Sequence, residues 1–251
     1  MIRHARALTR ITLIMLSLLV LLPFWLLTRL ITAGSPRLQR TSRDAWTRGW
    51  SRLAARLIGL RITISGTPPD PPFCLVSNHL SYLDAIVISA HAPGLMIAKS
   101  EVASWPLIGW LSTQIGTIFI DRKTSKDVMR VNDIIKKTLL DGNGVTFFPE
   151  GTTSDGQAVG RFHSSLLNYP ASVSYPVHYA TLRYESDHGN VVNDVCWWGD
   201  MTFGAHFYRM SQLPRIKAKI HFCTDPVTNP DRKELTGMLR SGVAQHFLPI
   251  N

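Results

Sequence analysis

The chain has 251 residues, 45% of them hydrophobic and 18% charged, so it can bury a sizeable core and is not a disordered tail. Its mean hydropathy of +0.05 is high for a soluble domain and indicates a membrane contribution. Residues 1–50 carry +7 of the formal net charge of +10, through eight arginines against Asp44. Because this excess surrounds one apolar segment, a nucleic-acid partner is disfavoured. Three cysteines without metal-ligand spacing argue against a disulfide scaffold and a zinc site, and favour a reducing compartment.

The apolar segment Ile11–Leu27 contains seventeen residues without a charge. As a helix it would be about 26 Å long, slightly shorter than a hydrocarbon core of roughly 30 Å. A secretory signal peptide is an alternative, but Ile31-Thr32-Ala33 is a poor cleavage site. Arginines on both flanks and Pro23 inside the run suggest a third arrangement, in which two helices lie in one leaflet.

The next stretch, residues 42–60, has the pattern of an amphipathic helix. Its apolar side chains recur at near-helical spacing, with arginines elsewhere on the surface: Trp46, Trp50, Leu53, Leu57 and Leu60. An interfacial helix against anionic headgroups needs this pattern, but so does an ordinary helix docked on the domain. Periodicity alone does not separate the two readings.

From residue 61 short strand-like runs alternate with helical ones, which predicts an α/β fold with a mostly parallel central sheet flanked by helices. We expect one α/β domain, residues 60–251. An N-terminal membrane anchor with an amphipathic helix, residues 1–59, precedes it. The expected runs are 61–66, 73–77, 95–100, 117–121, 145–150, 172–180, 191–198 and 216–224, with helices from 83, near 106, and at 124–140, 202–212 and 231–247.

Polar side chains follow three of the expected strands. Asn78 and His79 come directly after the run 73–77, at the carboxyl end of the sheet, where open α/β folds place their sites. Asp84 follows five residues later, and across a turn into a helix its carboxylate can fold back on the imidazole. Such a carboxylate fixes the tautomer that leaves the other ring nitrogen free as a base. By itself this spacing is weak, since chance also produces such pairs.

The other two strand ends offer groups for an anionic or polyhydroxyl ligand. Glu150 can accept a hydrogen bond, Gly151 frees backbone amides, and Thr152 supplies a hydroxyl. Arg122 ends a further strand, and a guanidinium can grip a phosphate in fork geometry. Each feature alone is also compatible with an ordinary strand-ending turn, but three in one sheet indicate a site.

Four sequence blocks together resemble the glycerolipid acyltransferase family that includes 1-acyl-glycerol-3-phosphate acyltransferase. They occur in order over about residues 60–180 and read NHLSYLD, GTIFIDR, FFPEGT and Tyr175-Pro176-Val177. The resemblance implies transfer of a fatty acyl group from acyl-CoA or acyl-carrier protein to a lysolipid hydroxyl at a membrane. It makes His79 the base and Asp84 its orienting partner, with substrate bound by Asn78, Arg122, Glu150, Gly151 and Thr152.

One departure from the family pattern concerns the acceptor. The third block usually continues E-G-T-R, but this chain has Thr153 in place of the arginine, so one phosphate contact is missing. With the following Ser-Asp-Gly and the run WWGDM at 197–201, the chain also resembles the lyso-ornithine lipid acyltransferase branch. The resemblance further implies the inner membrane, with the catalytic domain on its cytoplasmic side.

The sequence also allows two other functions, a serine lipase and a non-catalytic lipid-binding domain. A serine lipase would pair Ser81 or Ser154 with His79, although the chain has no G-x-S-x-G elbow. A non-catalytic membrane-anchored lipid-binding domain would have no use for a base. No metal or nucleotide cofactor is implied by any motif, and Cys74 inside an apolar strand is better read as a buried structural thiol.

Overall fold

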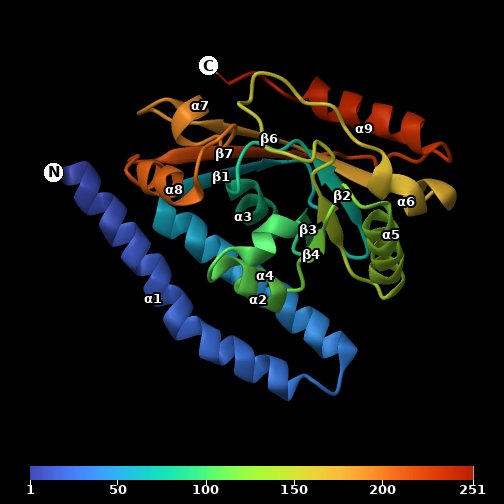
Figure 1. Ribbon diagram of the computed structural model, residues 1–251, viewed down its shortest axis with the longest axis horizontal. Coiled ribbons are helices and arrows are strands. Elements are labelled where there is room, and N and C mark those ends of the chain that lie inside the picture. Colours follow the sequence, from blue (N-terminus) through green and yellow to red (C-terminus); the bar gives the residue numbers. More distant parts are fainter. Residues whose placement is uncertain (251) are drawn as a thin grey trace.

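A seven-stranded sheet lies between two layers of helices in the computed structural model, which describes residues 1–250 (Figure 1). The strand order is β1-β7-β6-β2-β5-β3-β4. Five neighbouring strands, β6 to β4, are parallel, whereas β7 is antiparallel to β6 and parallel to β1. The prediction of a mostly parallel sheet is confirmed. The strands are β1 (Leu60–Ser65), β2 (Cys74–Ser77), β3 (Leu95–Lys99), β4 (Ile118–Ile120), β5 (Val145–Phe147), β6 (Val177–Glu185) and β7 (Ile216–Phe222).

Two hydrophobic cores, one on each face of the sheet, explain the layering. Strand β2 contributes Cys74 and Val76 to one core and Leu75 to the other, because successive side chains of a strand point to opposite faces. The first core lies against α5 (Ser125–Leu140), α6 (Asn168–Ser172) and α9 (Arg232–Gln245). The second lies against α3 (Leu83–Ser89), α7 (Val191–Asp194), α8 (Phe203–Ser211) and the N-terminal helices.

The remaining elements are short. A 3-10 turn η1 (Ser100–Ser104) and α4 (Ile108–Gln114) link β3 to β4, and η2 (Ser165–Leu167) precedes α6. The run at 191–198 forms the short helix α7 and a loop, not a strand.

The N-terminal residues form a helical hairpin of α1 (Ile2–Ile31) and α2 (Pro36–Ile58). Ser35 caps α2 by accepting from the Leu38 N–H, and Gly59 ends it at a φ of 77°. Leu60, which the periodicity places on the helical stripe, therefore begins β1 instead. Helix α1 is much longer than the uncharged run and is long and apolar enough to cross a membrane, judged by length and composition.

Both ends of α1 are attached to the folded body. Near its start, the Arg6 guanidinium donates to the Gln212 carbonyl at 2.7 Å, and that of Arg10 to the Leu213 carbonyl at 2.6 Å. These carbonyls follow the C-terminal end of α8, where a cation is favourable. Near its end, Arg29 donates to the Gln114 side chain of α4. Much of the face between these ends is apolar and exposed.

The hairpin 1–59 also shares a core with the body. Ile14 of α1 and Ala55 and Ile58 of α2 are buried in the cluster that contains β1, β6 and β7 side chains. The C-terminal half of α2 is thus docked on the domain, which is one of the two readings that its periodicity allows.

Candidate active site

The polar residues that follow the strands gather at the carboxyl ends of the parallel strands. His79 follows β2, Glu150 follows the neighbouring strand β5, and Arg122 follows β4 at the edge. Lys99 ends β3, which lies between β5 and β4. Because these strands are parallel, their carboxyl ends lie on the same side, as the sequence predicts.

A carboxylate holds the His79 imidazole in one orientation. Oδ2 of Asp84 lies 2.7 Å from Nδ1 of His79 and also accepts the backbone N–H groups of Leu80 and Ser81. Its other oxygen, Oδ1, accepts the Tyr184 hydroxyl at 2.7 Å. The Asp84 side chain is fully buried, whereas that of His79 is 21% exposed. A carboxylate fixed by four hydrogen bonds leaves Nε2 of His79 as the ring atom available for proton transfer.

The loop after β5 contacts the ring face and both backbone groups of His79. The Phe148 ring stacks on the imidazole with centroids 3.9 Å apart. The His79 backbone N–H donates to Oε1 of Glu150 at 3.1 Å, and its carbonyl accepts the Ser154 N–H at 3.0 Å. The histidine is therefore held at its ring and at both backbone groups.

An apolar cavity of about 760 Å³ opens in front of the imidazole, between the sheet, the hairpin and α4. His79 lines it together with the polar residues Lys99, Glu101, Arg122, Thr152 and Thr153, and with the backbone of Gly151. Its walls are otherwise mostly apolar and come from both hairpin helices; they include Ile14, Leu18, Leu22, Trp25, Trp46, Trp50 and Ala54. A long hydrocarbon chain fits such a lining.

Arg122 has the features of an anion-binding group. Burial lowers the pKa of its guanidinium, and Glu101 partly offsets this. Within residues 1–250 its buried Nε has no hydrogen-bond partner. Its guanidinium lies over Gly151, where φ is +79° and a Cβ would collide with it. A desolvated cation with unused donors favours an anionic ligand.

Two residues predicted to bind substrate have buried side chains that contact the backbone. Both amide atoms of Asn78 bond the backbone of Leu182 on β6, at 2.9 and 2.7 Å, and the side chain is buried. The Glu150 carboxyl is buried as well. Burial raises its pKa to about 7, although hydrogen bonds from the backbone N–H groups of His79 and Gly160 act to lower the pKa. Neither is among the residues that line the cavity in the described part of the chain.

Three residues at the site were missed by the sequence reasoning. Lys99 ends an expected strand, so the rule that found Arg122 could have found it. Phe148 lies in the FFPEGT segment, where its stacking on His79 has no local sequence signal. Tyr184 contacts Asp84 across 100 residues of sequence, and no local pattern signals that contact.

Neither candidate nucleophile pairs with the imidazole. Ser81 is buried and its Oγ has no hydrogen-bond partner within residues 1–250. Ser154 Oγ reaches the His79 carbonyl at 3.4 Å, not the ring. Burial raises the pKa of the Cys74 thiol to about 12, as befits a structural cysteine.

Known proteins are similar to this chain in sequence. The Acyltransferase family model matches residues 61–180. The lyso-ornithine lipid O-acyltransferase of Rhodobacter capsulatus is 30% identical over 77% of this chain and 74% of its own length. This chain belongs to that acyltransferase family. The 1-acyl-sn-glycerol-3-phosphate acyltransferase of Neisseria gonorrhoeae is 29% identical over 85% of this chain and 83% of its own length.

A solved structure extends the likeness to the hairpin. The crystal structure of the 1-acyl-sn-glycerophosphate acyltransferase from Thermotoga maritima covers 97% of each chain with a TM-score of 0.65, at 19% identity. The fold, including the N-terminal helices, is therefore shared. With the relatives above, the chain is an acyltransferase of the lysolipid type.

Proposed function

We propose that this acyltransferase is membrane-bound and moves a fatty acyl group from acyl-CoA or acyl-carrier protein to the free hydroxyl of a lysolipid. The first-choice acceptor is 1-acyl-glycerol-3-phosphate, which would give phosphatidic acid. The observation that carries the proposal is the His79–Asp84 pair, which faces an apolar cavity that also presents the unpaired guanidinium of Arg122.

The reaction needs a base and no covalent enzyme intermediate, because a thioester is already activated. Nε2 of His79 takes the proton of the acceptor hydroxyl as its oxygen attacks the thioester carbonyl. Asp84 stabilises the imidazolium that forms. The tetrahedral intermediate then collapses, the carbon–sulfur bond breaks, and the imidazolium returns its proton to the leaving thiolate.

Binding is divided between the polar and apolar parts of the cavity. Arg122 and Lys99 hold the acceptor headgroup, with Gly151 and Thr152 beside them. Lys99 supplies a second cation, so the absence of an arginine at position 153 does not leave the site with one. The apolar walls accommodate the acyl chain being transferred.

The attachment of α1 at both ends supports a placement along one leaflet. A helix whose two ends both bond the same folded body keeps those ends on one side of the bilayer. Its exposed apolar face would then be immersed to the depth of the acyl chains, as in other interfacial helices. A soluble thioester donor supports a catalytic domain on the cytoplasmic side of the inner membrane, which we propose as its location.

Lyso-ornithine lipid is the second candidate acceptor. Thr153 lines the cavity where the family pattern has a cation, and Glu101 lines it as well. This combination of fewer cations and one carboxylate suits a zwitterionic headgroup. Two relatives named lyso-ornithine lipid O-acyltransferase, from Rhodobacter capsulatus and Pseudomonas aeruginosa, are each 30% identical to this chain.

Removal of the base tests the reaction. His79→Ala should lower the rate of acyl transfer by 10²- to 10⁴-fold, the usual value of a general base, without changing the melting temperature. Asp84→Asn should also cause a large loss, because an amide permits the wrong imidazole tautomer. Transfer of labelled oleoyl groups to lysolipid measures both. A His79→Ala rate above a tenth of wild type would exclude the role.

Substitution at position 153 tests the acceptor. If lysophosphatidate is the substrate, Thr153→Arg should leave turnover equal or better, because it adds a phosphate contact. If a zwitterionic lysolipid is the substrate, the same change should penalise it by placing a cation near its ammonium group. The ratio of kcat/KM for the two acceptors, in wild type and variant, decides between them. An unchanged ratio would mean that Thr153 does not approach the headgroup.

A further inference from the structure

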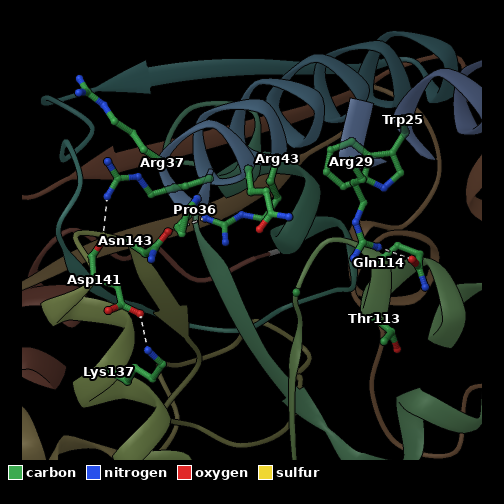
Figure 2. A pocket seen from close by; sticks show the side chains of 13 residues that line it. Trp25, Arg29, Pro36, Arg37, Arg43, Thr113, Gln114, Lys137, Asp141 and Asn143 are labelled. Atoms are coloured by element: carbon green, nitrogen blue, oxygen red, sulfur yellow. Dashed lines mark hydrogen bonds and ion pairs between the residues drawn. The ribbon is translucent and has the colours of Figure 1, made fainter. Parts of the chain in front are cut away.

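A second hollow, of about 640 Å³, lies at the tip of the helical hairpin. Figure 2 shows Asp141 and Asn143 of the turn that follows α5 on one side and Thr113 and Gln114 of α4 on the other; Arg29 reaches toward Gln114, whereas Arg37 points away from the turn. Five cationic side chains line it: Arg29, Arg37, Arg40, Arg43 and Lys137. We refer to it as the hairpin-tip pocket.

The hairpin-tip pocket lies at the amino ends of the parallel strands, whereas His79 lies at their carboxyl ends. Its lining residues Asp141 and Asn143 come just before β5, and Gly116 comes just before β4. His79 follows the carboxyl end of β2, which is parallel to β5. A ligand held in this pocket is therefore not held at the reacting centre, although Trp25 and Gln114 line both hollows.

The charges in the hairpin-tip pocket do not balance. Lys137 pairs with Asp141 at 2.9 Å, and Arg43 pairs with Asp44 at 2.7 Å. Within residues 1–250 the other three guanidinium groups, on Arg29, Arg37 and Arg40, form no ion pair. Such a surplus around one hollow favours an anion.

Two of these three guanidinium groups are held in place by neutral partners. Arg40 donates to the backbone carbonyls of Asp141 and Gly142 at 2.9 and 2.7 Å. Arg29 donates to Gln114 and lies 6.0 Å from the Trp25 ring centroid. Both keep N–H donors for a ligand, since a guanidinium has five. At the other end of α1, by contrast, Arg10 is engaged by the carbonyls after α8.

The surroundings of the hairpin-tip pocket indicate where its anion comes from. Leu30 and Ile31 at the end of α1 are each 73% exposed, and Leu38 in the first turns of α2 is 56% exposed. Cations beside exposed apolar side chains suit a lipid, whose phosphate lies at the headgroup level and whose chains lie below it. The exposed apolar side chains beside the cations therefore favour a lipid over a soluble anion.

We propose that the hairpin-tip pocket binds the phosphate group of an anionic phospholipid of the host leaflet, distinct from the acyl acceptor. This rests on the placement of α1 in a leaflet proposed above. Binding there fixes the depth of the hairpin tip, while the carbonyls of α8 fix the other end of α1.

The test compares two double variants that lose the same charge from the same hairpin. Arg29→Gln with Arg37→Gln removes two pocket cations. Arg3→Gln with Arg56→Gln removes two exposed hairpin cations that do not line the pocket. Cosedimentation is measured with vesicles of phosphatidylcholine alone and with about one third phosphatidylglycerol. The pocket variant should lose about tenfold in affinity for the anionic vesicles, the control variant several-fold less, and neither should change binding to phosphatidylcholine.

The outcomes separate the pocket from the membrane placement. Equal losses in the two double variants would mean diffuse attraction and would overturn the pocket, while leaving the placement of α1 intact. Wild-type protein that binds neither kind of vesicle would overturn the placement as well. Inorganic phosphate at matched ionic strength is the remaining arm: if it raises the melting temperature of wild type but not of the pocket variant, and phosphatidylglycerol vesicles show no preference, the site takes free phosphate and the lipid proposal fails.

Discussion

Glu150 couples the position of His79 to pH. Burial raises the pKa of this carboxyl from its ordinary 4.5 to about 7, so the folded protein binds a proton more tightly than the unfolded chain. The stability that this proton contributes is fully present below about pH 4.5 and is lost as the pH rises through about 7. Oε1 of the Glu150 carboxyl, which gains or loses this proton, accepts the His79 backbone N–H.

Glu150→Gln should therefore remove part of the pH dependence of unfolding. The amide is always neutral and keeps an oxygen for the His79 N–H. When the pH is raised from 5 to 8, the free energy of unfolding of the variant should therefore increase relative to that of wild type, by about 2 to 3 kcal/mol. Melting temperatures of both proteins at the two pH values measure this. Asp133→Asn, at an exposed position, is the control, and its melting temperature should differ from that of wild type by the same amount at both pH values. A Glu150→Gln difference that does not change with pH would contradict the raised pKa.

At the residue scale, the sequence predicted which residues gather but not which way each one points. Asn78 and His79 are neighbours, yet the amide faces β6 and the imidazole faces the cavity. Successive residues leaving a strand point in opposite directions, and only the neighbouring strand decides which side is the site. Tyr184 lies beyond local reasoning altogether, because it depends on β6 pairing beside β2.

At the element scale, the exposed face of α1 should govern membrane association. Leu19 is 71% exposed near the middle of this helix, so Leu19→Glu would place a charge among acyl chains. Vesicle flotation should show an affinity loss of at least tenfold. Met129 on α5 is 61% exposed away from the hairpin, and Met129→Glu should leave flotation unchanged. Equal behaviour of the two variants would place the membrane contact elsewhere.

The order of strands and helices was predictable because hydrophobic periodicity is local, whereas their lengths and directions were less so. Hydropathy marks residues 11–27, but α1 is 30 residues long. It extends through Arg6 and Arg10 because their guanidinium groups find carbonyl partners after α8, some 200 residues away. The antiparallel direction of β7 is likewise set by its pairing with β6, which composition does not reveal.

At the scale of the whole molecule, the apolar cavity in front of His79 exists only because the hairpin and the body pack together. Ala54 of α2 is buried on its wall, so Ala54→Phe should shorten the space available to a chain. The ratio of kcat/KM for dodecanoyl over octadecanoyl donors should rise about tenfold, because the octadecanoyl chain loses the burial of about two methylenes at about 0.8 kcal/mol each. Ala45→Phe, exposed on the same helix, is the control. An unchanged ratio in a folded variant would mean that the transferred chain lies outside this cavity.

If α1 lies along one leaflet as proposed, its attachment at both ends determines which substrate concentration governs the rate. A lysolipid that reaches His79 sideways from the leaflet never crosses water, and thus avoids an extraction cost of about 0.8 kcal/mol per methylene, or about 12 kcal/mol for a sixteen-carbon chain. The relevant quantity is then the mole fraction of lysolipid in the plane of the membrane. Adding inert phospholipid at constant total lysolipid should slow the enzyme, whereas diluting the whole suspension should not, as long as the enzyme stays on the vesicles.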